Sequence, residues 1–155
     1  MSKTSAGLIM YRRKNNVLEV LLVHPGGPFF AKKDQGFWGI PKGEIDEIDE
    51  DYLAAAKREF KEETGIAPPE ANTYIPLGSI VQKGGKTVHA WAFEGDCEPK
   101  KITSNTFILE WPPRSGKEQE FPEIDQAEFF TIEKAREKIK PAQFELLERL
   151  QKALA

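Results

Sequence analysis

The amino-acid sequence predicts an α/β (α+β) sandwich built on a mixed central β-sheet, and three observations support this fold class. Short apolar runs bounded by turn-forming residues occupy the first forty residues and the stretch from 74 to 132. A helical pattern interrupts them at residues 51–64. Further helical patterns follow the final strand. Strands on both sides of a helix, with more helices after them, are typical of a sheet covered by helices.

The first forty residues are predicted to be β structure. Residues 6–11 and 17–23 are short apolar runs, and residues 12–16 between them have the composition of a hairpin turn. A loop that contains glycine and proline follows at residues 24–36, and a short segment at residues 38–40 is then stopped by a proline.

Residues 51–64 form the best helical pattern in the chain. Asp49 or Asp51 can cap its N-terminus, and Gly65 is well placed to end it, with two prolines just beyond. The apolar residues at helical spacing, which form its predicted buried face, are Leu53, Ala56 and Phe60.

Beyond residue 73 the pattern returns to strands. Residues 74–82 and 87–94 flank the glycine-containing turn 83–86, which predicts a hairpin. Two further strands are expected at residues 106–111 and 128–132.

The C-terminal residues carry helical patterns at 133–139 and from Pro141 to the end. The inward stripe of the final helix is predicted to consist of Leu146, Leu147 and Leu150. No internal repeat, low-complexity tract or linker interrupts the chain, so we expect a single domain over residues 1–155.

Composition and charge limit the classes of function. The 155 residues, 39% hydrophobic and 30% charged, are typical of a soluble globular domain with no membrane association. The N-terminal segment lacks the apolar core of a secretory signal, and the single cysteine, Cys97, excludes an internal disulfide, so we expect a cytoplasmic protein. A net charge of −3 does not favour binding to long nucleic acid. The oligomeric state, monomer or homodimer, is left open.

Three glutamates stand out on the helix at residues 51–64. Glu59, Glu62 and Glu63 are spaced i, i+3 and i+4, which puts their carboxylates on one helix face. They also lie in the last turns, where the helix dipole is negative, so each costs a few tenths of a kcal/mol, roughly. A bound cation would relieve this cost, and carboxylate oxygens select magnesium or manganese rather than zinc. The simpler interpretation of these glutamates alone is a solvated acidic helix face.

The wider pattern resembles the Nudix box, the signature of the Nudix hydrolase family. That signature reads G-x5-E-x7-R-E-U-x-E-E-x-G-U, where U is apolar, and from Glu50 onward every fixed position is met in register. One extra residue separates Gly43 from Glu50, and we place Gly43 rather than Glu44 at the glycine position. The segment at residues 38–44 also resembles the usual approach to the box. The matching residues are Gly43, Glu50, Arg58, Glu59, Phe60, Glu62, Glu63, Gly65 and Ile66.

The resemblance implies an α/β/α sandwich and a metal-dependent hydrolase of diphosphate bonds. In this interpretation one or more Mg²⁺ ions, or Mn²⁺, are held by the box, and Arg58 orients neighbouring side chains by pairing with Glu59 or Glu50. The implied metal ligands are Gly43, through its carbonyl, together with Glu59, Glu62, Glu63 and Glu123.

Glu123 enters because family members often take a further acid from a downstream loop. Glu123 is the first choice for that acid and Glu120 the second, in a segment at residues 117–125 expected to be a loop. The identity of the general base, Glu63, Glu120 or Glu123, is left open.

Basic residues on loops are the candidates for binding substrate phosphates. We predict this role for Lys42, beside the box, for Lys83, near the hairpin that also carries Gln82 and Lys86, and for Arg114. The expected partner is thus a small-molecule nucleotide.

The leading functional hypothesis is hydrolysis of a nucleoside triphosphate or a dinucleoside polyphosphate. The alternative within the same chemistry is a pyrophosphatase acting on ADP-ribose, a nucleotide sugar or an RNA 5′ end. A non-catalytic, nucleotide-binding regulatory domain is the alternative of another class, and loss of the box glutamates, all present here, would indicate it. The isomerase branch of the fold is expected to need a reactive cysteine, and the context of Cys97 is unsuitable.

Overall fold

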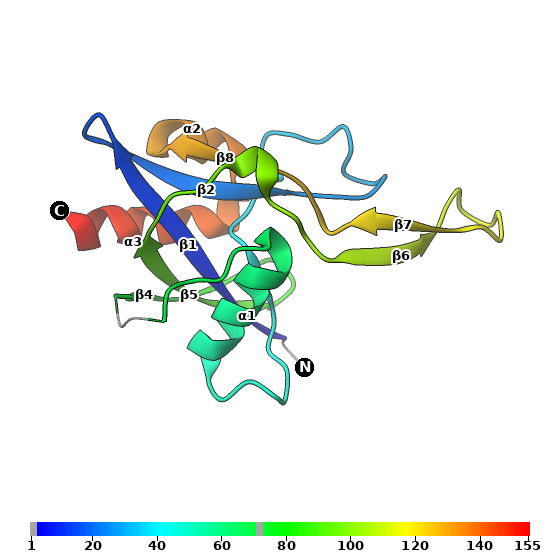
Figure 1. The fold of residues 1–155 in the computed structure, drawn as a ribbon, viewed down its shortest axis with the longest axis horizontal. Helices are drawn as coiled ribbons and strands as arrows, with labels where there is room; N and C mark the ends of the chain where they lie inside the picture. The colour runs from blue at the N-terminus through cyan, green and yellow to red at the C-terminus, as the bar shows by residue number, and fades with distance from the viewer. Residues whose placement is uncertain (1–2, 71–72) are drawn as a thin grey trace.

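A mixed six-stranded sheet forms the centre of the molecule (Figure 1), in a computed structural model that describes residues 3–70 and 73–155. The strand order is β4-β5-β1-β2-β8, and β3 pairs with β1. The pairing of β1 with β5 is parallel and the other pairings are antiparallel, which confirms the predicted mixed sheet. The strands are β1 (Thr4–Lys14), β2 (Val17–Pro25), β3 (Lys42–Glu44), β4 (Ile75–Val81), β5 (Thr87–Glu94) and β8 (Ile124–Thr131).

Helices cover both faces of this sheet, as expected for the sandwich. Helix α1 (Tyr52–Thr64) lies on one face, and α2 (Ile132–Lys138) and α3 (Phe144–Leu154) pack against the other. Two short 3-10 turns, η1 (Pro99–Lys101) and η2 (Pro141–Gln143), precede β6 and α3. Within the described ranges, no helix has the length and apolar character needed to cross a membrane.

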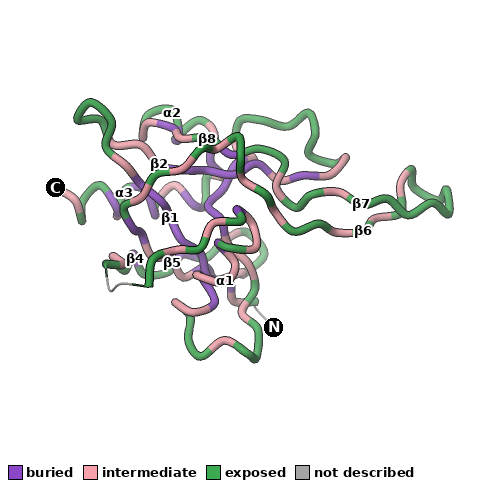
Figure 2. Tube along the Cα trace, in the orientation of Figure 1, coloured by how far each residue is buried: buried purple, intermediate pink, exposed green. Residues whose placement is uncertain are grey.

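Two hydrophobic clusters fill the space between the sheet and the helices, and long stretches of the central strands β1 and β2 are buried (Figure 2). Successive residues of a strand face opposite sides, so β1 sends Leu8 towards α1 and Ile9 towards α3. Because both faces are covered, β1 and β2 are apolar on both sides, which explains their continuous apolar runs. The predicted inward stripe of α3 is confirmed, since Leu146, Leu147 and Leu150 are fully buried.

The ends of α1 follow from local chemistry. Asp51, rather than Asp49, is the N-cap, and its carboxylate accepts a hydrogen bond from the Ala54 N–H at 2.8 Å. Gly65 ends the helix in the left-handed conformation, at φ 76°. On the buried face, Ala55 joins Ala56 and Phe60, whereas Leu53 is only partly buried.

The first hairpin turn is tighter than predicted. Only Asn15 and Asn16 form it, at φ 54° and 66°, a left-handed pair that asparagine tolerates and that suits a two-residue hairpin. Residues 12–14, expected in the turn, continue β1 and pair with β2.

Two differences from the predicted strands concern polar sequence. Residues 118–122, expected in a loop, form strand β7 (Glu118–Pro122), which pairs with β6 (Thr106–Glu110) in a separate ribbon that projects from the body (Figure 1). Strand β8 begins at Ile124, four residues before its predicted start. Both stretches are mostly exposed, so no buried face imposes the apolar alternation that strand prediction relies on.

Strand β1 has two partners on the same edge. Its N-terminal half pairs with β3 (Ser5 with Glu44, Gly7 with Lys42), and its C-terminal half pairs with β2 (Tyr11 with Val20). Strands β2 and β3 therefore leave β1 at different points, and the candidate site lies where they diverge.

Candidate active site

The last two turns of α1 present the box glutamates next to β3. Glu59 lies directly against the backbone of Gly43, because a Cβ placed on Gly43 would be 2.0 Å from Oε2 of Glu59. The α1 backbone is held in place here by Thr64, whose buried hydroxyl donates to the Phe60 carbonyl at 2.7 Å. Glycine at position 43 thus permits an approach between carboxylate and strand that any other residue would block.

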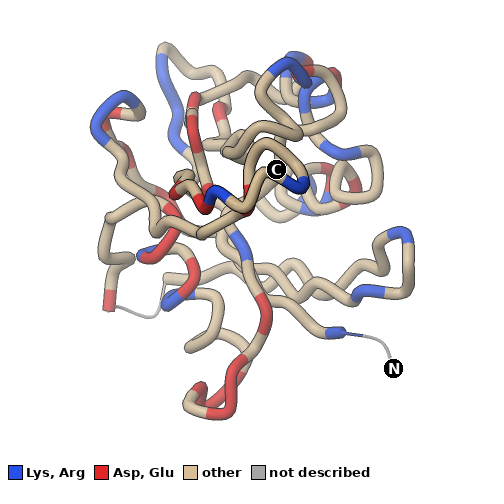
Figure 3. Tube along the Cα trace, turned by 90° about the vertical axis from the view of Figure 1, so that its right-hand side faces the viewer, with Lys and Arg blue, Asp and Glu red and all other residues tan. Residues whose placement is uncertain are grey.

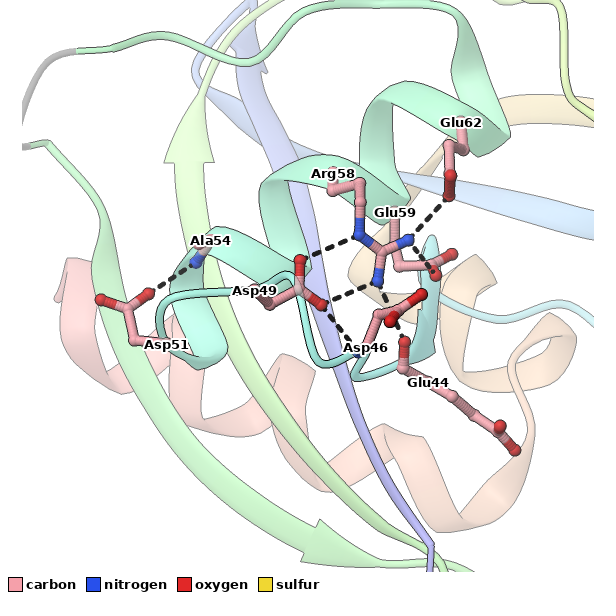
Figure 4. Close-up of polar contacts among 8 residues, drawn as sticks. All are labelled: Glu44, Asp46, Asp49, Asp51, Ala54, Arg58, Glu59 and Glu62. Atoms are coloured by element: carbon pink, nitrogen blue, oxygen red, sulfur yellow. Dashed lines mark hydrogen bonds and ion pairs between the residues drawn. The ribbon is translucent and has the colours of Figure 1, made fainter.

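Arg58 organises two of the box glutamates (Figure 4). Its Nη1 donates to Glu59 at 2.8 Å and to Glu62 at 2.9 Å. Its Nε and Nη2 donate to both carboxylate oxygens of Asp49 at 2.9 Å, and Nη2 also donates to the Glu44 carbonyl. These hydrogen bonds, those to Asp49 first, raise the pKa of Arg58. The expected contact with Glu59 is therefore present.

The other expected partner of Arg58 was Glu50, and the structure corrects this to Asp49. The Asp49 side chain is only 4% exposed, and its hydrogen bonds to Arg58 lower its pKa. Five residues separate Gly43 from Asp49, as the signature requires of its acid, so the extra residue falls between Asp49 and Arg58. That five-residue spacing was the signal available in the sequence, with aspartate in place of glutamate.

Glu63 and Lys42 meet beside Gly43. The backbone N–H of Lys42 donates to Oε1 of Glu63 at 3.2 Å. Burial, followed by the charge of Glu59, raises the pKa of Glu63 to about 8. Burial, followed by the charges of Lys86 and Lys140, lowers the pKa of Lys42 to about 8. The structure thus buries an acid and a base next to each other at the end of α1.

Glu123 is fixed close to the box by its backbone. Its N–H donates to the Asn105 carbonyl and its carbonyl accepts from the Gly26 N–H, both at 2.8 Å, while the Asn105 N–H donates to the Glu62 carbonyl at 2.8 Å. Burial, and then the charge of Glu62, raises the pKa of Glu123. The structure therefore brings this acid, the first choice from the sequence, to the end of α1.

Glu120 lies elsewhere. It is exposed on β7, within the projecting ribbon, and its carboxylate accepts a hydrogen bond from the Thr106 hydroxyl at 2.7 Å.

Three lysines from different segments gather on the other side of the site. Lys42 precedes Gly43 in β3, Lys86 precedes β5, and Lys140 precedes η2; burial, and then the charge of Lys86, lowers the pKa of Lys140. Lys83 lies in the exposed turn before Lys86. Sequence reasoning missed Lys140, since nothing in its surroundings marks it as part of the site.

Arg114 is exposed in the loop at the far end of the β6–β7 ribbon, away from α1 (Figure 1). Elsewhere acidic and basic residues are interspersed over the surface, apart from the acidic loop at residues 44–51 that leads into α1 (Figure 3).

The carboxylates fit a divalent cation by the type of their donor atoms. Glu59, Glu62, Glu63 and Glu123 offer oxygen ligands, which Mg²⁺ prefers, and each of Glu59, Glu63 and Glu123 has its pKa raised in part by a neighbouring carboxylate. As the side chains lie, however, no three His, Cys, Asp or Glu residues of the described chain are grouped to hold a metal ion. Metal binding would therefore require these carboxylates to move closer together.

A small pocket of about 90 Å³ lies where β2 and β3 diverge. Its polar lining comes from Lys42, Glu63, Lys140 and Gln143, and Phe37 contributes an apolar wall. Two larger hollows, of about 550 and 640 Å³, flank β8 at residues 125–128 and contain none of the box glutamates. One acid suited to a cation, Glu63, and two lysines suited to phosphate thus meet at the smaller pocket, which makes it the better candidate.

The comparisons with known proteins agree with this geometry. A sequence profile described as "NUDIX domain" matches residues 1–150. No curated protein sequence matches the chain.

Among solved structures, similarity extends over the whole fold. The NUDIX domain of Shewanella oneidensis NrtR, in complex with ADP ribose, is 17% identical, with a TM-score of 0.68, and the match covers 100% of this chain and 90% of that one. An Ap4A hydrolase of C. elegans in a binary complex is 25% identical, with a TM-score of 0.62 and coverage of 98% and 97%. A MutT protein from Methanosarcina mazei Go1 is 18% identical, with a TM-score of 0.62 and coverage of 99% and 95%.

Proposed function

Because the chain belongs to the NUDIX domain family, we propose that it is a magnesium-dependent hydrolase that cleaves a diphosphate bond in a nucleoside-diphosphate-linked substrate. The proposed substrate is a nucleoside triphosphate or a dinucleoside polyphosphate. One observation carries this proposal: Glu63 of α1 lines one pocket together with Lys42 and Lys140, and the charges of Glu59 and Glu123 act on Glu63. An oligophosphate chain has the charge that such lysines would bind. The similarity to an Ap4A hydrolase supports the same substrate class.

The proposed roles of the residues follow from their contacts. Glu59, Glu62, Glu63 and Glu123, with the Gly43 carbonyl, would hold Mg²⁺. When bound, the ion neutralises phosphate oxygens and lowers the pKa of an attacking water. Arg58 positions Glu59 and Glu62 through its hydrogen bonds.

The lysines Lys42, Lys86 and Lys140 would orient the phosphates, and positioning of this kind is a large part of catalysis in phosphoryl-type displacement. Glu63 and Glu123 are the candidates for the general base, because both lie at the end of α1 and a raised pKa makes a carboxylate a stronger proton acceptor.

The test is product release from a panel of substrates with and without Mg²⁺: nucleoside triphosphates, dinucleoside polyphosphates, ADP-ribose and capped RNA. Glu62→Gln and Glu63→Gln should each lower kcat by at least about 100-fold, since each removes a charged ligand at the reacting centre. Glu148→Gln, an exposed glutamate on α3, is the matched control and should retain wild-type turnover.

Each class of outcome has a distinct meaning. Magnesium-dependent turnover of ADP-ribose alone would replace the proposed substrate with a nucleotide sugar. Binding of nucleotides without turnover of any substrate would indicate a regulatory domain and contradict the proposed enzyme.

A further inference from the structure

Gln143 is a buried amide whose hydrogen bonds join separate segments of the chain. Its side chain is 0% exposed and lies at the end of η2. Its Oε1 accepts from the Ile40 N–H at 3.0 Å, and its Nε2 donates to Oε1 of Gln82 at 2.7 Å. The orientation of the amide follows from chemistry, because a backbone N–H can only donate. Gly39 leaves room for it, since a Cβ there would be 3.0 Å from Oε1 of Gln143.

Each segment that Gln143 joins carries one lysine of the candidate site. Its first partner lies two residues before Lys42. Its second partner, Gln82, donates its own N–H to the Lys86 carbonyl at 2.7 Å and so closes the turn that bears this lysine. The N–H of Gln143 itself donates to the Lys140 carbonyl at 2.9 Å. The buried side chain of Gln143 therefore joins the segments that carry Lys42 and Lys86, and its backbone N–H adds the segment that carries Lys140.

Such a connection serves a purpose beyond filling space. Lys42 and Lys140 line the same small pocket as Gln143, and like charges this close repel one another. The repulsion favours their separation unless the backbones are held. The carboxylate of Glu63, which lines the same pocket, offsets part of the repulsion, and an anion bound between the lysines would relieve it further.

We infer that Gln143 is a positioning residue that holds Lys42, Lys86 and Lys140 as one subsite for a phosphate group of the substrate. The inference deepens the proposed function and rests on it in so far as the substrate carries phosphates. Three lysine charges are more than a single phosphodiester group would require, so we assign the subsite to an oligophosphate chain.

The test uses inorganic tripolyphosphate as the probe, titrated calorimetrically into the full chain with Mg²⁺, alongside kcat and KM for the substrate turned over by the wild type. Gln143→Leu should weaken tripolyphosphate binding about tenfold and raise KM by a similar factor. A change of this size corresponds to the loss of one charge-assisted contact between a lysine and a phosphate. Its kcat should fall by a smaller factor than KM rises, because the lysines bind phosphates in the ground state as well as orienting them. Gln151→Leu, on an exposed position of α3, is the matched control and should bind like the wild type.

A double-mutant comparison distinguishes this positioning role from a purely structural role for Gln143. In a Lys86→Gln background, Gln143→Leu should add less than about twofold, because the Gln143 side chain acts on Lys86 through Gln82 and residues that act through each other are non-additive. A full tenfold loss in that background would overturn the inference. Gln82→Leu removes only the half-buried end of the connection, so it provides the same comparison if Gln143→Leu fails to fold.

The inference and the proposed function fail separately. If no substrate is turned over but tripolyphosphate binding still depends on Gln143, the proposed function is wrong and the subsite stands. If turnover occurs but Gln143→Leu leaves both KM and tripolyphosphate binding unchanged, the subsite is wrong and the proposed function stands. Absence of tripolyphosphate binding by the wild type would also overturn the subsite.

Discussion

Asp49→Asn tests the identity of the acid that anchors Arg58. The carboxylate of Asp49 accepts two hydrogen bonds from the guanidinium at 2.9 Å and one from the Asp46 N–H at 2.8 Å. Asparagine keeps one acceptor oxygen but turns an amide donor towards a second donor, so one charge-assisted bond is lost. Such a bond contributes about 1.5–3 kcal/mol, and because Arg58 is 24% exposed we take a value near the lower end, about 2 kcal/mol.

A loss of about 2 kcal/mol should lower the Tm by about 4–8 °C in a chain of this size. Thermal unfolding followed by circular dichroism at pH 7 measures it. Glu50→Gln makes the same change of acid to amide on the exposed neighbouring residue, and should leave the Tm within about 1 °C. Equal Tm values for Asp49→Asn and the wild type, or a larger loss in Glu50→Gln, would refute the assignment of Asp49 as the partner.

The same pair predicts a dependence on pH. Arg58 lowers the pKa of Asp49 in the folded state, so the stability it provides is present above the unfolded pKa of about 3.9. That stability is lost as the pH falls towards the folded pKa. The difference in Tm between Asp49→Asn and the wild type should therefore be full at pH 7 and shrink below about pH 4. A difference that is constant down to pH 3 would contradict the ion pair.

Three further changes have defined outcomes. Gly43→Ala should displace Glu59, because the new Cβ would lie 2.0 Å from the Glu59 carboxylate. This displacement should lower kcat about 100-fold in the turnover assay. Unchanged turnover would show that Glu59 is free to move. Ser5→Ala should raise the free energy of unfolding by about 1 kcal/mol in urea titration, because the buried Ser5 hydroxyl has no hydrogen-bond partner among the described residues. A loss of stability would show that the hydroxyl does have a partner. The pKa of Glu63 is raised to about 8 in the folded state. Without divalent metal, the wild type should therefore lose stability as the pH rises from about 4 through 8. Glu63→Gln should lose less stability over this range, and an equal loss would contradict the burial of this carboxylate.

The parts of the fold that were predictable are those where burial imposes a pattern. Helix α1 was located to within one residue because its cap Asp51, its terminating Gly65 and its buried Phe60 all act within a few residues of sequence. Strand β7 was missed because four of its five residues are exposed, so burial does not demand alternating apolar residues there. Burial, rather than strand formation itself, is what leaves a trace in the sequence.

The candidate site divides in the same way. The spacing of Glu59, Glu62 and Glu63 on one helix is local, so the sequence contains it directly. Lys140 belongs to the site only because the Trp38 carbonyl accepts its N–H at 2.8 Å, across about a hundred residues of chain. Asp49 is an intermediate case. Its spacing from Gly43 was visible in the sequence, but the choice between Asp49 and Glu50 depended on which of the two side chains contacts Arg58.

The three-residue strand β3 sets the chemical polarity of the pocket. Gly43 faces α1 and its glutamates, while the neighbouring Lys42 lies against Gly7 on the opposite face of the sheet. Because side chains alternate with a period of two, slipping β3 by one residue along β1 would exchange these two environments. A lysine would then occupy the place where Glu59 now meets bare backbone, and the anionic and cationic halves of the pocket would be mixed. The order of two adjacent residues, lysine then glycine, thus determines which side of the pocket is anionic and which is cationic.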